Sequence, residues 1–183
     1  RYIQFDLTIQ NDDLTPGEIS WNVNDGTLDV GLDNDVTLQL GQESHYRVKN
    51  QTGATILNGR LVSAVGTLGA SGRISASYSV ADGTVPARYI IGVATSDILN
   101  GVDGYVTEFG LVRGIDATGT PYGETWANGD ILWANPNIVG GLTNQEPEPG
   151  GNTGVKVEVA IVVDAVASGS IFVRVTNGFK LHE

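Results

Sequence analysis

The residues that could act as nucleophile and base are few and poorly placed for that chemistry. The chain has two histidines, and one of them, His45, directly follows Ser44. A serine nucleophile needs its histidine base within hydrogen-bond reach, whereas neighbouring residues of a strand point to opposite faces. His182 lies in the terminal tail, where we expect a solvated side chain. The two histidines therefore predict no hydrolase site.

Two carboxylates, Glu146 and Glu148, flank Pro147 and could be imagined as the acid and nucleophile of a glycosidase. A proline-rich loop is a poor place to fix such a pair, because catalytic geometry needs rigid support. The sequence also lacks a G-x-S-x-G elbow, a G-x-x-x-x-G-K phosphate loop and an H-E-x-x-H motif. We expect no catalytic residues, no cofactor-binding residues and no enzymatic activity.

Acidic turns raise the question of a calcium site. Asp33-Asn34-Asp35 begins like a calcium loop, but the sixth position is Leu38 and not glycine, and the twelfth is Ser44 and not an acidic residue. The cluster at residues 11–13 could still meet Asp25 or Asp29 in space and offer oxygen ligands. Ordinary turn chemistry is the simpler interpretation, and we predict no metal ligands.

Aromatic side chains suggest one binding alternative. The tryptophans Trp21, Trp126 and Trp133 could line a sugar groove. Tryptophan in a β-rich domain more often packs into the core, and we favour that role.

Composition limits the classes of partner. The 183 residues suit one domain, or one domain with an arm, and the formal charge of −11 disfavours nucleic acid and anionic membranes. Cysteine is absent, and no apolar run approaches the 18 residues of a membrane span. The chain begins at Arg1 and contains no methionine, from which we expect it to be part of a longer protein.

Two strands within residues 89–116 should organise the fold. An apolar run at residues 89–94 is followed by an alternating run at 105–115, and neither face of the second run is purely polar. Such a strand lies between packed layers or at a subunit contact. The apolar runs at residues 131–133 and 155–163 are its expected partners.

The N-terminal region consists of short pieces separated by turn signals. We expect a strand over residues 1–10 and a hairpin at Asp25-Gly26. Recurrent Asn-Gly and Asp-Gly dipeptides without helical periodicity predict an all-β fold, an antiparallel β-sandwich or barrel. Residues 1–44 are predicted to form an arm or small β-meander for docking or oligomer contact, and residues 45–183 the sandwich or barrel domain.

A series of segments resembles a family of tailed-bacteriophage virion structural proteins, whose members are head-fibre, head-decoration or tail-fibre-like proteins. The segments, in order, are WN (21–22), DGTLDVGL (25–32), LGQE (40–43), RVKNQTGA (47–54), IGVAT (91–95), FGLVRGID (109–116) and GDILW (129–133).

The resemblance implies a homo-oligomeric, trimeric attachment domain preceded by a longer, variable N-terminal part. Its partners would be other copies of itself and the major capsid protein or another virion protein. It would be made in the host cytoplasm and sit on the virion exterior as a capsid decoration or head fibre, away from the packaged DNA. The alternative is a tail-fibre or fibre-tip domain that binds a host receptor or glycan through residues 119–126 and 144–153.

Overall fold

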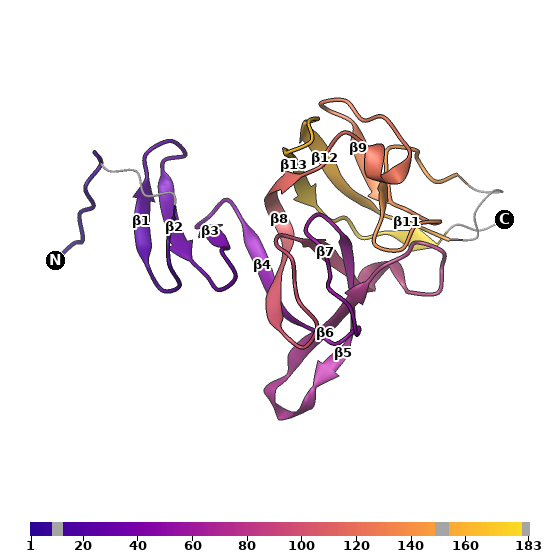
Figure 1. Ribbon diagram of the computed structural model, residues 1–183, viewed down its shortest axis with the longest axis horizontal. Helices are drawn as coiled ribbons and strands as arrows, with labels where there is room; N and C mark the ends of the chain where they lie inside the picture. Colours follow the sequence, from indigo (N-terminus) through magenta and orange to yellow (C-terminus); the bar gives the residue numbers. More distant parts are fainter. Residues whose placement is uncertain (9–12, 149–153, 181–183) are drawn as a thin grey trace.

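The protein is nearly all β, with 44% of the residues that the structure describes in strands and 5% in short helical turns, which confirms the predicted fold class. The computed structural model describes residues 1–8, 13–148 and 154–180. A small N-terminal sheet stands apart from the body and leads into it through one strand (Figure 1). None of the helices in the described ranges is long and apolar enough to cross a membrane.

The N-terminal sheet, here called the arm sheet, is an antiparallel meander. Its strands are β1 (Ile19–Asn22), β2 (Thr27–Gly31) and β3 (Thr37–Gln39). The predicted hairpin at Asp25-Gly26 joins β1 to β2, and Gly26 has the positive φ of 65° that such a turn favours.

The strand expected at residues 1–10 is wrong for residues 1–8, which form no strand, while residues 9 and 10 lie outside the described ranges. A strand needs a neighbour for its backbone hydrogen bonds. None of the described strands pairs with residues 1–8.

Five strands of the body close into a barrel in the order β8-β4-β6-β5-β7 and back to β8. The described part of the body has two buried apolar clusters, and one of them fills the barrel. It includes Val48, Ile56, Val62, Ala94, Ile98 and Val106. The barrel strands are β4 (Ser44–Asn50), β5 (Leu61–Leu68), β6 (Arg73–Tyr78), β7 (Ile90–Ala94) and β8 (Asp103–Ile115).

One barrel pairing departs from the antiparallel expectation, because β4 and β6 run parallel. The chain leaves β4 and crosses the barrel through residues 51–60, where Ile56 bridges to Ile98. Strand β5 then runs antiparallel to both β6 and β7, and β6 lies beside β4 and runs in the same direction as β4. The crossover contains turn residues, Gly53 and the dipeptide Asn58-Gly59, but they do not specify a parallel pairing of β4 with β6.

The two strands expected to organise the chain do so. Strands β7 and β8 pair antiparallel through Val93 and Thr107 and close the barrel. Gly92 makes this closure possible, because a Cβ atom there would lie 2.1 Å from the carbonyl oxygen of Thr107. The first half of β8 belongs to the barrel, and the second half pairs with β13 (Gly169–Arg174). The runs at residues 131–133 and 155–163, expected as its partners, do not pair with β8, because β13 lies between.

Beyond β8 the same sheet continues as a four-strand extension, the wing, in the order β8-β13-β12-β9-β10 (Figure 1). A second cluster of buried apolar residues packs the inner side of the wing against residues of β5 and β7. The remaining elements are β9 (Ile131–Ala134), β10 (Leu142–Thr143), β12 (Glu158–Asp164), β13 (Gly169–Arg174), the ribbon β11 (Val155–Lys156) with β14 (Phe179–Lys180), and the turns η1 (Gly69–Ser71), η2 (Ala87–Tyr89) and η3 (Thr120–Tyr122).

Candidate functional site

The outer side of the wing carries a row of large apolar side chains in register across four strands. Ile131 pairs with Ile161, Ile161 with Phe172, and Phe172 with Leu111. Ile131 and Ile161 are 43% and 41% exposed, and Phe172 and Leu111 are half-buried. Their sequence neighbours on the opposite side are core residues. An outward row of this composition is unusual for a surface facing water.

Neighbouring positions extend the row into a continuous face. Phe109 packs edge-to-face on Phe172 with 5.2 Å between ring centroids. The charged residues at outward positions of these strands are of both signs: Arg113 and Asp164 both pair with Ser170, Arg174 pairs with Phe109, and Glu158 pairs with Trp133. We call the apolar set the wing face; it comprises Phe109, Leu111, Ile131, Trp133, Ile161, Val163 and Phe172.

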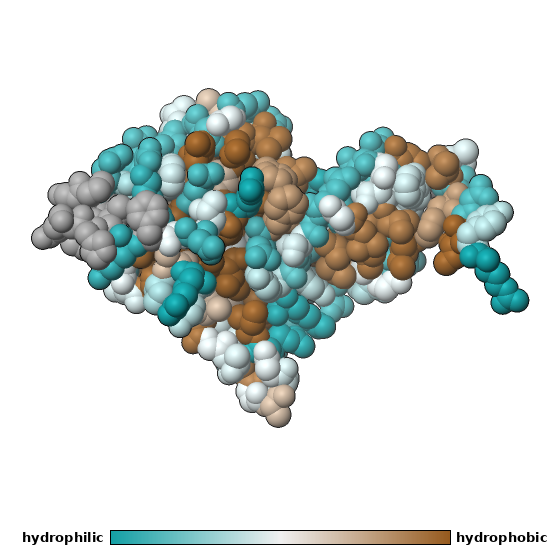
Figure 2. All heavy atoms as spheres, turned by 180° about the vertical axis from the view of Figure 1, so that it is seen from behind, coloured by the Kyte–Doolittle hydropathy of each residue, from teal (hydrophilic) through white to brown (hydrophobic). Residues whose placement is uncertain are grey.

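A second apolar face lies on the arm sheet. In register, Ile19 pairs with Val30 and Val30 with Leu38, while Trp21 pairs with Leu28. Ile19 is 54% exposed, and none of the other four side chains is buried. We call these five residues the arm face. Figure 2 shows apolar side chains gathered on the arm and in patches on the body.

The opposite side of the arm sheet is polar and buried, which inverts the usual arrangement of a half-solvated sheet. Asn22, Thr27, Asp29 and Gln39 are all at most 9% exposed. The Asn22 amide donates to carboxylate oxygens of Asp25 and Asp29 at 3.1 and 3.0 Å, and the Gln39 amide donates to Asp25 at 2.6 Å. Hydrogen bonds satisfy this side internally, so the apolar side is left outward.

The arm sheet is tied to the barrel by a joint of charged and polar contacts. Arg113 of β8 donates to Glu43 and to Gln39, each at 3.1 Å. Asn34 donates its amide to the backbone oxygen of Asp103 at 2.8 Å. These contacts fix the arm on β8 with the arm face turned away from the joint.

Asp103 lies at the centre of the second half of this joint. Its carboxylate contacts Arg73, Arg47 at 3.4 Å and Lys49 at 3.7 Å, and Arg47 also contacts Asp33 at 3.2 Å. Burial raises the pKa of Asp103, but the three surrounding cations outweigh this, so its pKa lies below the ordinary value. The carboxylate therefore holds three barrel cations together, and one of them, Arg47, also contacts Asp33 of the arm.

The structure gives the sequence candidates for catalysis other roles. His45 places Nδ1 3.2 Å from the Thr107 hydroxyl and Nε2 3.7 Å from Glu43, while Ser44 is exposed. Burial lowers the pKa of the His45 ring, and the charge of Glu43 only partly opposes this. His182 lies outside the described residues.

The paired glutamates are likewise not brought together as a reactive couple. Glu146 forms an ion pair with Lys156, whose ammonium group lies 5.0 Å from the centre of the Trp133 ring. Glu148 is exposed on the same loop. An ion-paired carboxylate and an exposed one on a surface loop lack the rigid support that an acid and a nucleophile need.

The acidic turns act structurally. Asp33 and Asn34 belong to the arm joint, and Asn34 and Asp35 have left-handed φ angles of 61° and 54°. Asp25 is bridged to Asp29 by the Asn22 amide, and Asp13 is exposed. Asn11 and Asp12 lie outside the described ranges. Within those ranges, no three histidine or acidic side chains gather as metal ligands would.

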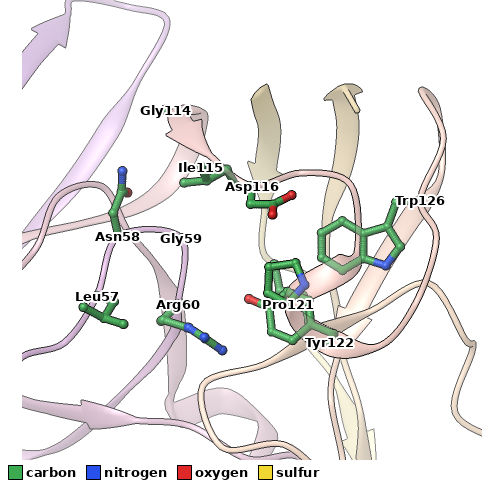
Figure 3. Close-up of a pocket in the computed structure, with 11 residues that line it drawn as sticks. Leu57, Asn58, Gly59, Arg60, Gly114, Ile115, Asp116, Pro121, Tyr122 and Trp126 are labelled. Carbon is green, nitrogen blue, oxygen red and sulfur yellow. The ribbon is translucent and has the colours of Figure 1, made fainter. Parts of the chain in front are cut away.

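The tryptophans divide between core and surfaces. Trp126 is 4% exposed, stacks on Tyr122 at 5.2 Å and donates to Glu124 at 2.7 Å. Beside this stack lies a pocket of about 200 Å³, into which the loop with Tyr122 and the side chain of Arg60 project (Figure 3). The guanidinium of Arg60 lies 5.1 Å from the centre of the Tyr122 ring. Trp21 and Trp133 belong to the arm face and the wing face.

Comparison with known proteins finds no family model and no curated protein that matches the chain. The two apolar faces are also the feature that sequence reasoning located least well. The run around Phe109 and Leu111 signalled a contact surface, since neither side of that strand is polar. The contributions of Ile131, Ile161 and Phe172 depend on strand register, which no local pattern specifies.

Proposed function

We propose that the chain is a non-enzymatic structural protein of a bacteriophage virion, an exterior capsid-decoration or head-fibre component that assembles as a homotrimer. The observation that carries the proposal is the pair of apolar sheet faces that a single copy leaves uncovered. Monomeric proteins rarely expose contiguous apolar areas of this kind, whereas subunits of symmetric assemblies do. The segment resemblance supplies the virion context.

The arm suits docking on the particle. Residues 1–8 precede the arm sheet and expose large apolar side chains, with Tyr2 88%, Ile3 83% and Leu7 61% exposed. We propose that they contact the major capsid protein or another virion protein, while the barrel and wing form the oligomer body. The net charge of −11 agrees with a position away from the packaged DNA and the host membrane. The protein would be made in the host cytoplasm.

Electron microscopy of purified particles with gold-tagged antibody against residues 45–183 tests the proposal. Label over the capsid is the expected result, and particles assembled with a chain lacking residues 1–44 should lose it. Label on the tail would contradict the head assignment. Label that persists without residues 1–44 would contradict docking through the arm.

A second candidate function is favoured by the pocket beside Tyr122. Arg60 and Asp116 offer hydrogen-bonding groups at a concave surface formed partly by residues 119–126, as a fibre-tip receptor or glycan site would require. Binding of the purified protein to host cells or glycans, lost in Arg60→Ala, would favour this function. Unchanged binding in that variant would exclude the pocket.

A further inference from the structure

The two uncovered faces match each other in shape. A three-stranded sheet with strands of up to five residues measures about 14 by 17 Å at the standard spacings of about 4.8 Å between strands and about 3.4 Å along them. The wing face spans four paired strands, so the arm face fits within it. Two apolar sheet faces pack stably on one another about 10 Å apart, in the manner of a β-sandwich.

Charge distinguishes between the two ways of covering these faces. Residues 1–44 contain nine acidic residues and a single arginine, so the arm carries a formal charge of −8 out of the −11 of the chain. Packing arm against arm would bring these charges together. The outward charges of the wing strands are balanced, with Arg113 and Arg174 against Glu158 and Asp164, and Arg113 is already bound to Glu43. An acidic arm therefore meets less repulsion on a wing than on a second arm.

The arm of a given copy does not cover the wing of that same copy. Its sheet is held on β8 by the Arg113, Glu43 and Gln39 contacts, and Ile19 and Ile161 are both left largely exposed. An arm that covers a wing must therefore belong to another copy.

We propose that the arm face of one copy packs on the wing face of a second copy, head to tail. Each copy donates one arm and accepts another, and the assembly closes into a ring when the last arm reaches the first wing. The inference rests on the proposed assembly role and deepens it, because it names the partner of each face. Arg174 of the accepting copy lies against the acidic arm of the donor.

The size of the contact explains why closure matters. A face of about 240 Å² in plan gives about 480 Å² when both partners are counted, which is below the roughly 1,000 Å² expected of a specific protein interface. Such a contact is weak when it is made once. In a closed ring every copy makes it twice, once as donor and once as acceptor.

Cysteine cross-linking of the full chain tests the arrangement, and the absence of native cysteine makes each introduced thiol a clean reporter. Leu28→Cys marks the centre of the arm face, and Ile161→Cys marks the wing face. The two variants carry different affinity tags, are co-expressed and are treated with a short bis-maleimide. We expect a cross-linked species that carries both tags, at about twice the 19.2 kDa of the chain.

The matched control replaces Ile161→Cys with Val65→Cys, which lies on β5 outside both faces and is 57% exposed. Its cross-linking to Leu28→Cys should be lower by at least tenfold. Val30→Cys provides a second arm reporter should Leu28→Cys fold poorly.

Three results would overturn the inference. Cross-links confined to arm–arm or wing–wing pairs in an assembled oligomer would show that the faces pair with themselves, and the proposed assembly role would stand. Equal cross-linking of Val65→Cys would show that the contact is not specific. A chain that light scattering finds monomeric at every concentration would overturn both this inference and the proposed homo-oligomer.

Discussion

Ile161→Ser should weaken the assembly while leaving the single copy stable. Ile161 sits in the middle of the wing-face row and is 41% exposed in one copy. Burying a whole isoleucine side chain contributes about 1.5–3 kcal/mol, so the part still exposed would contribute about 1 kcal/mol when an arm covers it. In a trimer with three such contacts the loss is about 3 kcal/mol, or about 150-fold in the dissociation constant.

A dilution series followed by analytical ultracentrifugation measures this effect. The dissociation constant of a trimer scales with the square of concentration, so the concentration of half-dissociation should rise about 12-fold. Val65→Ser, which removes a 57% exposed valine outside both faces, is the control and should leave this concentration unchanged. Urea unfolding of the two variants should differ by less than about 0.5 kcal/mol, because both positions are on the surface. An equal effect of both substitutions, or no effect of Ile161→Ser, would refute the role of the wing face.

Three further perturbations test the joint and the barrel. The pKa of Asp103 is lowered in the folded protein, so its contribution to stability is present above its unfolded pKa and is lost as the pH falls through the folded pKa. Urea titrations between pH 7 and pH 2 should therefore show a loss of stability below about pH 4, and this loss should be smaller in Asp103→Asn. Burial also lowers the folded pKa of His45, so the unfolded chain binds the proton more readily than the folded one. The stability of the fold should therefore decrease as the pH drops below about 6.5. In thermal melts, His45→Gln should reduce this pH dependence. Gly92→Ala should destabilise the barrel by about 3 kcal/mol in urea unfolding, because its methyl group would collide with the Thr107 carbonyl. Gly101→Ala is the control: its Cβ atom meets nothing within 4 Å, so it should cost only about 1 kcal/mol, for its positive φ. Equal losses in the two glycine variants would contradict the close approach of β7 to β8.

The fold class and the central strand pair follow from local patterns. Asp25-Gly26 marks a hairpin because glycine readily adopts the positive φ that Gly26 has in the turn, and the alternation through Thr107, Phe109 and Leu111 marks a strand neither side of which is purely polar. Both signals are contained within a few residues. The parallel pairing of β4 with β6 depends instead on the crossover of residues 51–60, so no window of sequence carries it.

The candidate site was only partly accessible to sequence reasoning for the same reason. The arm appears polar and apolar in alternation, and the pattern alone does not say which side faces water. Burial of Asn22 and Gln39 depends on the specific geometry of the Asp25 and Asp29 carboxylates. The strand expected at residues 1–10 failed for a different reason. Apolar and polar residues alternate there, but residues 1–8 form no strand because none of the described strands offers an edge to pair with them.

The way β4 links arm and body has a mechanical consequence. Strand β4 pairs with β8 from Ser44 to Lys49 and with β6 from Val48 to Asn50, and it is the strand through which the chain passes from the arm sheet into the barrel. A pull on the arm along the axis of β4 loads its hydrogen bonds to β8 in shear, so that several must yield together, and the bonds to β6 share the load at the far end of the strand. A strand at an open edge would peel away one bond at a time. The attachment of the arm should therefore resist tension better than its small sheet suggests, as the proposed docking of the protein through its arm would require.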